Sequence, residues 1–331
     1  MVKRLLAALT ALMILNAFCA WYYNPAPYLS SPDRATDTVR TPGARTSQAR
    51  EGIGAHRIDA QGYNNARAAE AGEIGVLMMG SSHTEGFNVA AGRDVSSQLQ
   101  ALLAQDGGGE TVYNIGMSSH TFTRNAANLS RALARFRPSG WVVLETDSVA
   151  LWADAVHAAY YDEMEPLPAT DVPLPLLSGQ PLAKRLYKQV MSLLKLDDEG
   201  TAVTDADLTD ELLADYEDIL TMWFEKLNAS ATQAGARLMI WYHPHLEIAL
   251  DGTARAKALE PCRAAFAGAC ARAGVTFVDL TDVFLDAYAR EHILPHGFDN
   301  TAMGQGHLNA DGHRMAAESI RAAMRAAEVS A

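Results

Sequence analysis

The chain has 331 residues, of which 49% are hydrophobic, so it is long enough to bury a sizeable core. Its formal net charge is -12, and no long basic run interrupts the sequence. Binding to nucleic acid requires clustered Lys and Arg that neutralise phosphates, so the composition excludes nucleic acid as an expected partner.

The first segment, residues 1–23, has the pattern of a targeting sequence. Lys3 and Arg4 precede an apolar stretch whose length suits a signal anchor or a long signal peptide. Phe18 stands three residues before a cut after Ala20, so a small-x-small cleavage site is missing. We therefore favour a retained membrane anchor over a cleaved, secreted form. Basic residues at its start predict an extracytoplasmic location for the remaining chain.

Residues 24–70 are rich in Pro, Ser, Thr, Arg and Ala and show no clear periodicity. This composition predicts an extracytoplasmic linker that carries the following domain, residues 71–331, away from the membrane.

From Glu73 onward, apolar strands alternate with helices. Strands are predicted over residues 74–79, 111–115, 141–144, 237–241 and 276–280. Helices are predicted over residues 93–105, 122–136, 209–233, 255–273 and 309–327. Five strand–helix repeats predict an α/β fold in which helices cover both faces of a parallel sheet. The proline-containing stretch 151–208 is too long for a simple connection, so we interpret it as an insertion after strand three that covers the site or receives substrate.

Polar residues follow the predicted strand ends, where ligands bind in open α/β sheets. In chain order they are Ser82, Ser118-Ser119-His120, Thr146-Asp147-Ser148, His243-Pro244-His245 and His307. Ser82 is the candidate nucleophile, because a small-residue turn places its hydroxyl where a helix begins and backbone N–H groups favour negative charge. His307 precedes the last predicted helix and is the candidate general base.

A metal site and a disulfide are both disfavoured by spacing. Cys262 and Cys270 are eight residues apart on one predicted helix, about 12 Å, which exceeds disulfide reach, so we expect buried free thiols. His243, His245 and His296 suggest metal ligation, but the sequence shows no third ligand of suitable geometry. We expect neither a metal nor a cofactor.

Over residues 73–327 the chain resembles the SGNH/GDSL hydrolase superfamily. Gly80-Ser81-Ser82 is similar to its Gly-Asp-Ser block, and residues 113–119, YNIGMSS, are similar to its second block. His307 matches the histidine of the last block. The resemblance implies a three-layer αβα sandwich with a flavodoxin-like five-stranded parallel sheet. It also implies ester hydrolysis or acyl transfer through a serine and a histidine.

The sequence departs from the family pattern at the other site positions. Ser119 stands where the oxyanion glycine is usual, and residues 144–148 replace the Gly-x-Asn-Asp block. The resemblance therefore implies an oxyanion hole formed by Ser82, Gly116 and Ser119, with Thr146 as the substitute for the missing asparagine. Gly304 occupies the position of the usual acid, and Asp299 is the candidate replacement. The alternatives are that Asp299 is a solvated loop residue and that a backbone carbonyl orients His307.

The remaining polar side chains at the strand ends are candidates for substrate binding. They are His83, His120, Asp147 and His243. For His83 and His120 the alternative is hydrogen bonding to the loop backbone.

Two functions follow from these expectations. One is an anchored, extracytoplasmic serine esterase or O-acyltransferase that acts on an acyl ester, with cell-envelope glycans as the expected donor or acceptor and lipid esters as the competitor. The other is an inactive domain that binds envelope polysaccharide or scaffolds an envelope modification complex.

Overall fold

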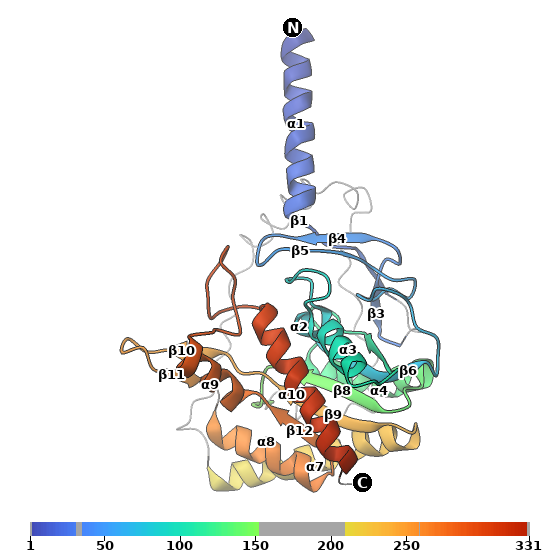
Figure 1. The fold of residues 1–331 in the computed structure, drawn as a ribbon, viewed down its shortest axis with the longest axis vertical. Coiled ribbons are helices and arrows are strands. Elements are labelled where there is room, and N and C mark those ends of the chain that lie inside the picture. Colours follow the sequence, from blue (N-terminus) through green and yellow to red (C-terminus); the bar gives the residue numbers. More distant parts are fainter. Residues whose placement is uncertain (1, 31–34, 152–208, 258, 330–331) are drawn as a thin grey trace.

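The computed structural model describes residues 2–30, 35–151, 209–257 and 259–329 (Figure 1). The predicted insertion, from residue 152 to residue 208, lies outside these ranges. The described residues form a central parallel sheet with helices on both sides, and an N-terminal part that lies across one end of the sheet.

The central sheet has five parallel strands in the order β7-β6-β8-β9-β12. These strands are β6 (Ile74–Met79), β7 (Thr111–Asn114), β8 (Trp141–Thr146), β9 (Arg237–Tyr242) and β12 (Thr276–Asp279). The order 2-1-3-4-5 is that of a flavodoxin-like sheet, so the predicted fold class is confirmed. β6 is buried along its whole length because strands cover both its edges and helices cover both its faces.

Alternate residues of the central strands point into two separate cores. On one face, Leu77 and Leu144 pack with α4 (Phe122–Phe136), α7 (Asp210–Gln233) and α8 (Glu260–Arg272). On the other face, Met78 and Val143 pack with the remaining long helices. These are α3 (Val95–Gln105), α9 (Thr281–Glu291) and α10 (Ala310–Val329). The result is a three-layer αβα sandwich.

Three elements of this domain are absent from the sequence prediction. They are α9 and the two strands of an antiparallel hairpin, β10 (Leu246–Ile248) and β11 (Ala254–Ala256). The hairpin occupies residues that were predicted to begin a helix over 255–273, and α8 instead begins at Glu260 with a proline in its first turn. Cys262 and Cys270 are buried free thiols on α8, as expected.

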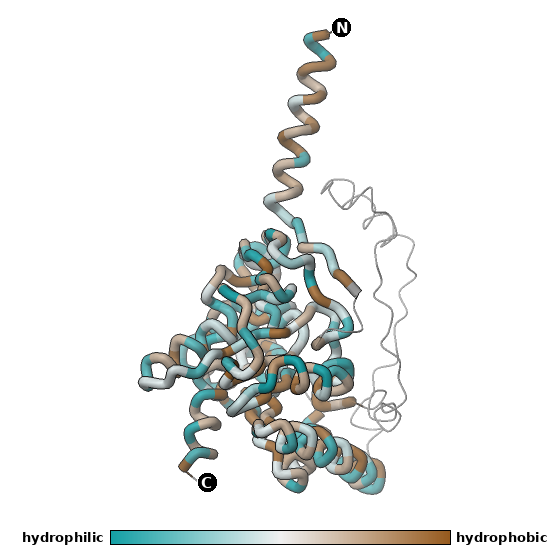
Figure 2. The backbone as a smooth tube through the Cα atoms, turned by 90° about the vertical axis from the view of Figure 1, so that its right-hand side faces the viewer, coloured by the Kyte–Doolittle hydropathy of each residue, from teal (hydrophilic) through white to brown (hydrophobic). Residues whose placement is uncertain are grey.

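The N-terminal helix, α1 (Val2–Tyr22), projects away from the domain and is mainly apolar in the hydropathy colours of Figure 2. It is long and apolar enough to cross a membrane, and little of its surface is buried. The base of the helix is attached to the domain, because Ser47 Oγ donates to Ala20 O at 2.6 Å and Ala49 N donates to Tyr22 O at 2.8 Å.

Residues 24–70 are folded against the domain, so the predicted linker is wrong for the part that the structure describes. One antiparallel sheet has the order β1-β4-β5, formed by β1 (Tyr23–Asn24), β4 (Arg45–Gln48) and β5 (Gly54–Arg57). A second pairs β2 (Tyr28–Ser30) with β3 (Thr38–Arg40). Val39 and Tyr63 join the core that contains α4, which explains why this polar segment has a fixed structure.

Candidate active site

Ser82 is the first residue of the one-turn helix α2 (Ser82–Glu85), which directly follows β6. Ser81 is the N-cap and its side chain accepts a hydrogen bond from His83 N. The turn requires glycine at position 80, because a Cβ there would lie 2.0 Å from Thr84 Oγ1 and 2.3 Å from a Glu145 oxygen. The tight turn therefore places the Ser82 hydroxyl at the carboxyl edge of the sheet.

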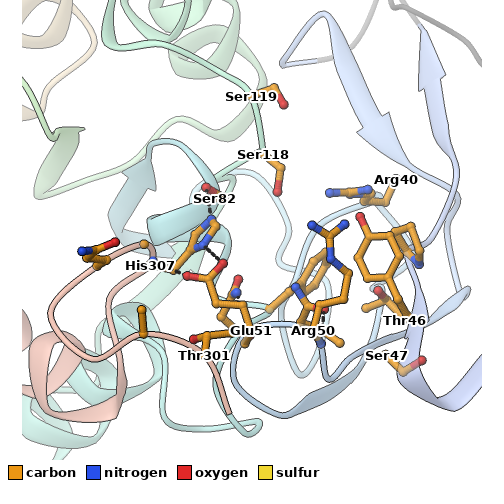
Figure 3. Close-up of a pocket in the computed structure, with 18 residues that line it drawn as sticks. Arg40, Thr46, Ser47, Arg50, Glu51, Ser82, Ser118, Ser119, Thr301 and His307 are labelled. Carbon is orange, nitrogen blue, oxygen red and sulfur yellow. Dashed lines mark hydrogen bonds and ion pairs between the residues drawn. The ribbon is translucent and has the colours of Figure 1, made fainter. Parts of the chain in front are cut away.

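A chain of three side chains leads away from this hydroxyl (Figure 3). Ser82 Oγ lies 2.9 Å from His307 Nε2, and His307 Nδ1 lies 2.7 Å from Glu51 Oε2. The backbone N–H of His307 also donates to Glu51 Oε1 at 2.6 Å. A carboxylate accepts the proton on Nδ1, which leaves a lone pair on Nε2 to accept the serine proton. This is the arrangement of a nucleophile, a base and an orienting acid.

Glu51 is held in its ionised form. Partial burial opposes the charge, but the hydrogen bonds from His307 outweigh burial and lower the pKa of Glu51 below its ordinary value of 4.5. The side chains of Glu51 and His307 are 23% and 29% exposed, so both remain reachable from solvent.

The prediction that Asp299 orients His307 is wrong, since Glu51 occupies that place. Asp299 is exposed, and the next residue, Asn300, supports the loop that carries the acid. Asn300 Nδ2 donates to Ala49 O and Gly52 O, and Gly52 N donates to Asn300 Oδ1. Glu51 was missed because it precedes His307 by 256 residues and lies in a segment without periodicity. No local signal in the sequence identifies it.

Two of the four predicted oxyanion donors remain available. Among the described residues, no hydrogen bond engages the backbone N–H of Ser82 or of Ser119. Gly116 N is engaged, because it donates to Asn114 Oδ1 at 2.8 Å. Thr146 is also engaged, since its hydroxyl donates to Ser148 O at 2.5 Å. The prediction that Gly116 and Thr146 donate to the oxyanion is therefore wrong, and both residues have structural roles.

A buried ion pair fixes the loop that carries Ser119. Arg40 on β3 donates Nε and Nη2 to the two carboxylate oxygens of Glu85 at 2.8 and 2.9 Å. Glu85 also accepts from the backbone N and the hydroxyl of Ser118. Tyr28 OH donates to Ser118 O at 3.3 Å. The N-terminal strands thus help to place Ser119, which has a left-handed backbone with φ of 70°.

Glu145 at the end of β8 anchors the serine turn from the other side. Its oxygens accept from Ser81 N, Ser81 Oγ, Thr84 N and Thr84 Oγ1. His243 Nε2 lies 3.3 Å from the same carboxylate. Although burial opposes the charge, the hydrogen bonds from His243 and Ser81 lower the pKa of Glu145 strongly. A buried carboxylate therefore holds the turn next to the nucleophile.

The four side chains predicted to bind substrate occupy different environments. His83, His120 and Asp147 border a cavity of about 320 Å³ that Ser82 and Ser119 also line. Asp147 is exposed, whereas His120 is buried and its Nε2 lies 2.9 Å from Thr38 Oγ1. His243 is fully buried between Glu145 and His296, so it has no surface for a ligand.

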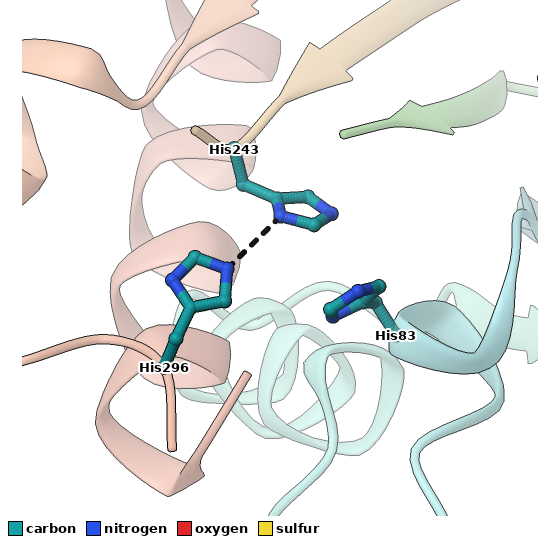
Figure 4. Close-up of side chains that lie close together, drawn as sticks. All are labelled: His83, His243 and His296. Carbon is teal, nitrogen blue, oxygen red and sulfur yellow. Dashed lines mark hydrogen bonds between the residues drawn. The ribbon is translucent and has the colours of Figure 1, made fainter. Parts of the chain in front are cut away.

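His83, His243 and His296 form a buried cluster behind the site (Figure 4). One ring nitrogen from each lies within 4.8 Å of the others, and His243 Nδ1 is 3.4 Å from His296 Nε2. His83 Nδ1 accepts the Leu308 N–H at 3.2 Å, so the proton of the neutral ring is on Nε2. His83 therefore presents N–H rather than a lone pair to the other two rings, which is unsuitable for a metal ligand. Burial and the neighbouring rings lower the pKa of His83 and of His296, which keeps both neutral.

A second, larger opening gives access to Ser82 and is called here the serine cleft. Its volume is about 530 Å³, and Glu51, Ser82, Ser119 and His307 line one side. The N-terminal strands form the other side. Their contribution includes Tyr23, Arg40, Thr46 and Arg50 (Figure 3). The cleft can thus hold a polar molecule against the serine hydroxyl.

Comparison with known proteins finds similarity at the level of structure. No family model matches the chain, and no curated protein matches it by sequence. A protein of Slackia heliotrinireducens described as an SGNH hydrolase is 16% identical, over 76% of this chain and 98% of its own, with a TM-score of 0.39. A GDSL-like lipase from Parabacteroides merdae is 12% identical, over 77% and 97%, with a TM-score of 0.43. The acetyl xylan esterase AlAXEase is 13% identical, over 75% and 98%, with a TM-score of 0.40.

These names include the superfamily that the sequence motifs resemble. The identities lie below 25% and the TM-scores below 0.5, so only the side chains of this chain bear on its chemistry.

Proposed function

We propose that this protein is a serine esterase or O-acyltransferase, and the observation that carries the proposal is the hydrogen-bonded chain Ser82–His307–Glu51. Ser82 Oγ attacks the carbonyl carbon of an acyl ester while His307 Nε2 takes its proton. Glu51 stabilises the imidazolium that forms. Collapse of the tetrahedral intermediate breaks the ester bond, and His307 returns the proton to the departing alcohol. The acyl group is then on Ser82.

The second half of the reaction decides between the two activities. Water attacking the acyl-enzyme gives hydrolysis, whereas a sugar hydroxyl gives acyl transfer, and in both cases His307 again acts as base and then as acid. The N–H groups of Ser82 and Ser119 are the candidate donors to the oxyanion in both steps. Losing the asparagine donor of the family pattern leaves two donors in place of three.

We place the reaction outside the cytoplasm, at the cell envelope. Supporting this location are the apolar helix α1 and the basic residues Lys3 and Arg4 at its start. Several side chains that line the serine cleft are polar, among them Thr46, Gln48 and Arg50, which favours a glycan ester over a long-chain lipid ester. An envelope modification complex remains a candidate partner.

The alternative, a catalytically inactive binding domain, rests on the departures from the second, third and last blocks of the family pattern. Glu51 supplies a carboxylate at 2.7 Å from His307 Nδ1, which supports the enzyme over that alternative.

A fluorophosphonate probe tests the proposal directly, because it labels only an activated serine. We expect the wild-type chain to be labelled and the Ser82→Ala and His307→Ala variants to remain unlabelled. The Ser47→Ala variant is the matched control and should remain labelled, since it also removes a serine hydroxyl from the lining of the serine cleft but lies on β4, outside the proposed catalytic machinery. Absence of labelling in a folded wild-type protein would overturn the proposal.

Partition of the acyl group separates hydrolysis from transfer. Acetate release from 4-methylumbelliferyl acetate is measured with and without an added soluble glycan. Hydrolysis gives one acetate for each fluorophore released, whereas transfer reduces free acetate and places acetyl groups on the glycan.

A further inference from the structure

The two arginines that line the serine cleft differ in whether a carboxylate forms an ion pair with them. Arg40 is neutralised by Glu85 through two hydrogen bonds, and both side chains are almost fully buried. Arg50 is exposed, and no carboxylate forms an ion pair with it in the part of the chain that the structure describes. The cleft therefore contains an exposed cation that makes no direct ion pair with a described residue, in a protein whose net charge is -12.

Arg50 is also held in position within the cleft. Its backbone N–H donates to Gln48 Oε1 at 3.0 Å, and its guanidinium carbon lies 5.0 Å from the centre of the Tyr23 ring. Figure 3 shows the guanidinium directed into the space between Glu51 and the strands on the far side of the cleft. Stacking on an aromatic ring leaves the edge of the guanidinium, with its N–H donors, free to contact a ligand.

The neighbouring acid attracts Arg50 but does not occupy its donors. Arg50 contributes to lowering the pKa of Glu51, whereas both oxygens of Glu51 accept hydrogen bonds from His307, one from the ring and one from the backbone. A planar guanidinium with free donors matches a carboxylate or a phosphate, which accept two parallel hydrogen bonds. Arg50 would attract such an anion and thereby bring a substrate that carries it into the serine cleft, next to Ser82.

We propose that Arg50 is a specificity subsite for an anionic group, a carboxylate or a phosphate, on the glycan portion of the acyl ester. The assignment rests on the proposed function, because it concerns the substrate that Ser82 attacks. It predicts that the enzyme prefers esters of acidic sugars over esters of neutral sugars.

The test uses two esters that differ by one group. Methyl glucuronoside and methyl glucoside, acetylated at the same hydroxyl, differ in having a carboxylate or a CH₂OH group. Acetate release gives kcat/KM for each, and their ratio measures charge preference. We expect the wild-type ratio to favour the glucuronoside about ten- to hundredfold, the range of a hydrogen bond between charged groups.

Variants of Arg50 test whether this residue causes the difference in kcat/KM between the two esters. Arg50→Gln is expected to bring the ratio close to one, and Arg50→Lys to restore part of it. Arg57→Gln is the matched control, since Arg57 is an exposed arginine on β5 of the same hairpin and does not line the serine cleft. It is expected to keep the wild-type ratio. A wild-type ratio near one, or a ratio that survives Arg50→Gln, overturns the subsite.

Failure of the proposed function gives a different result. If neither sugar ester nor 4-methylumbelliferyl acetate is hydrolysed and the fluorophosphonate does not label Ser82, the enzyme assignment fails. Calorimetric binding of methyl glucuronoside against methyl glucoside then decides the subsite alone. If only vesicles of phosphatidylglycerol, and not of phosphatidylcholine, are hydrolysed, the anion belongs to a lipid headgroup and the glycan assignment is overturned.

Discussion

Glu51 reaches His307 from a loop between two short strands, and that loop depends on two close backbone approaches. A Cβ at Gly52 would lie 2.0 Å from Asn88 O, and a Cβ at Gly306 would lie 2.1 Å from Glu51 Oε1. Both glycines have positive φ, 70° and 79°. The carboxylate can therefore contact both the ring and the backbone of His307 because neither loop carries a side chain at the contact.

Replacing the acid tests its role at the scale of one residue. Glu51→Gln keeps the shape of the side chain, but its NH₂ group can donate to Nδ1, which moves the ring proton to Nε2 and prevents it from accepting the serine proton. We expect kcat to fall on the order of 10³–10⁴-fold, as when a triad carboxylate becomes an amide. Turnover of 4-methylumbelliferyl acetate measures this effect, and the rate of fluorophosphonate labelling should fall with it.

Asp299→Asn is the control for that experiment. It removes a carboxylate from the neighbouring loop, where Asp299 is exposed. We expect its labelling rate to equal that of the wild type, and a loss as large as that of Glu51→Gln would show that Asp299 contributes the acid.

The Arg40–Glu85 pair is a second test at residue scale. Arg40→Met leaves a buried carboxylate without its cation, so we expect the free energy of unfolding to fall by about 3–5 kcal/mol. Arg255→Met is the control, because Arg255 and Glu247 form an exposed pair whose loss costs at most about 1 kcal/mol. Urea denaturation measures both, and equal losses would contradict the importance of burial.

At the scale of elements, the loop after β7 packs directly against α2, and Gly116 is the residue of that loop at the contact. A Cβ at this position would lie 2.6 Å from Glu85 N and 2.8 Å from Thr84 C, which are backbone atoms of α2. The Ser82 and Ser119 N–H groups belong to these two elements, so their separation depends on this contact.

Gly116→Ala is therefore expected to push α2 from the loop and to reduce both stability and labelling. Overpacking of this kind costs about 1–3 kcal/mol. Gly109→Ala is the control, since nothing lies within 4 Å of its Cβ position. Urea denaturation and fluorophosphonate labelling give the comparison, and matching behaviour of the two variants would show that the contact is unimportant.

The N-terminal strands form a structural part of the site, and truncation tests this. Removal of residues 1–22 deletes α1 but keeps β1 and the β4–β5 hairpin, so we expect a folded, labelled protein. Removal of residues 1–57 deletes Arg40 and Glu51 and should abolish labelling. A linker would tolerate both truncations equally, and that result would contradict the fold described for this segment.

At the scale of the whole molecule, buried histidines make stability depend on pH. Burial, with Arg124 nearby, lowers the pKa of His120 from 6.5 to about 4, despite the opposing charge of Asp37. Burial also lowers the pKa of His313 to about 3. The unfolded chain therefore binds more protons than the folded chain below pH 6.5. This makes the free energy of unfolding decrease as pH falls from 6.5 toward 4.

For His120 alone, the predicted decrease in the free energy of unfolding is about 3 kcal/mol. It follows from the difference between the pKa values of this ring in the unfolded and folded chains. The pKa of Glu145 is lowered in the folded state, so its contribution is present at neutral pH and is lost only as pH falls below about 4.5. Urea denaturation at pH 7.5, 6 and 5 should show the loss beginning near pH 6.5. His120→Asn should reduce the slope, and the exposed His292→Asn should retain it; constant stability down to pH 5 would contradict the prediction.

The sequence by itself determined the central sheet, its helices and two members of the candidate triad. The strand–helix alternation could be recognised because each strand is buried and each helix has an apolar face, which are local patterns. Ser82 and His307 could be proposed because both follow elements of this alternation, at the edge where strand ends meet.

Only the tertiary structure decided the orienting acid, the available oxyanion donors and the fate of residues 24–70. Glu51 contacts His307 across 256 residues of chain, and a contact between irregular loops leaves no periodic signal. Gly116 and Thr146 could be excluded only when their hydrogen-bond partners were known. The N-terminal strands are short and polar, and they are ordered by packing on the domain, a long-range contact that leaves no signal in the local sequence.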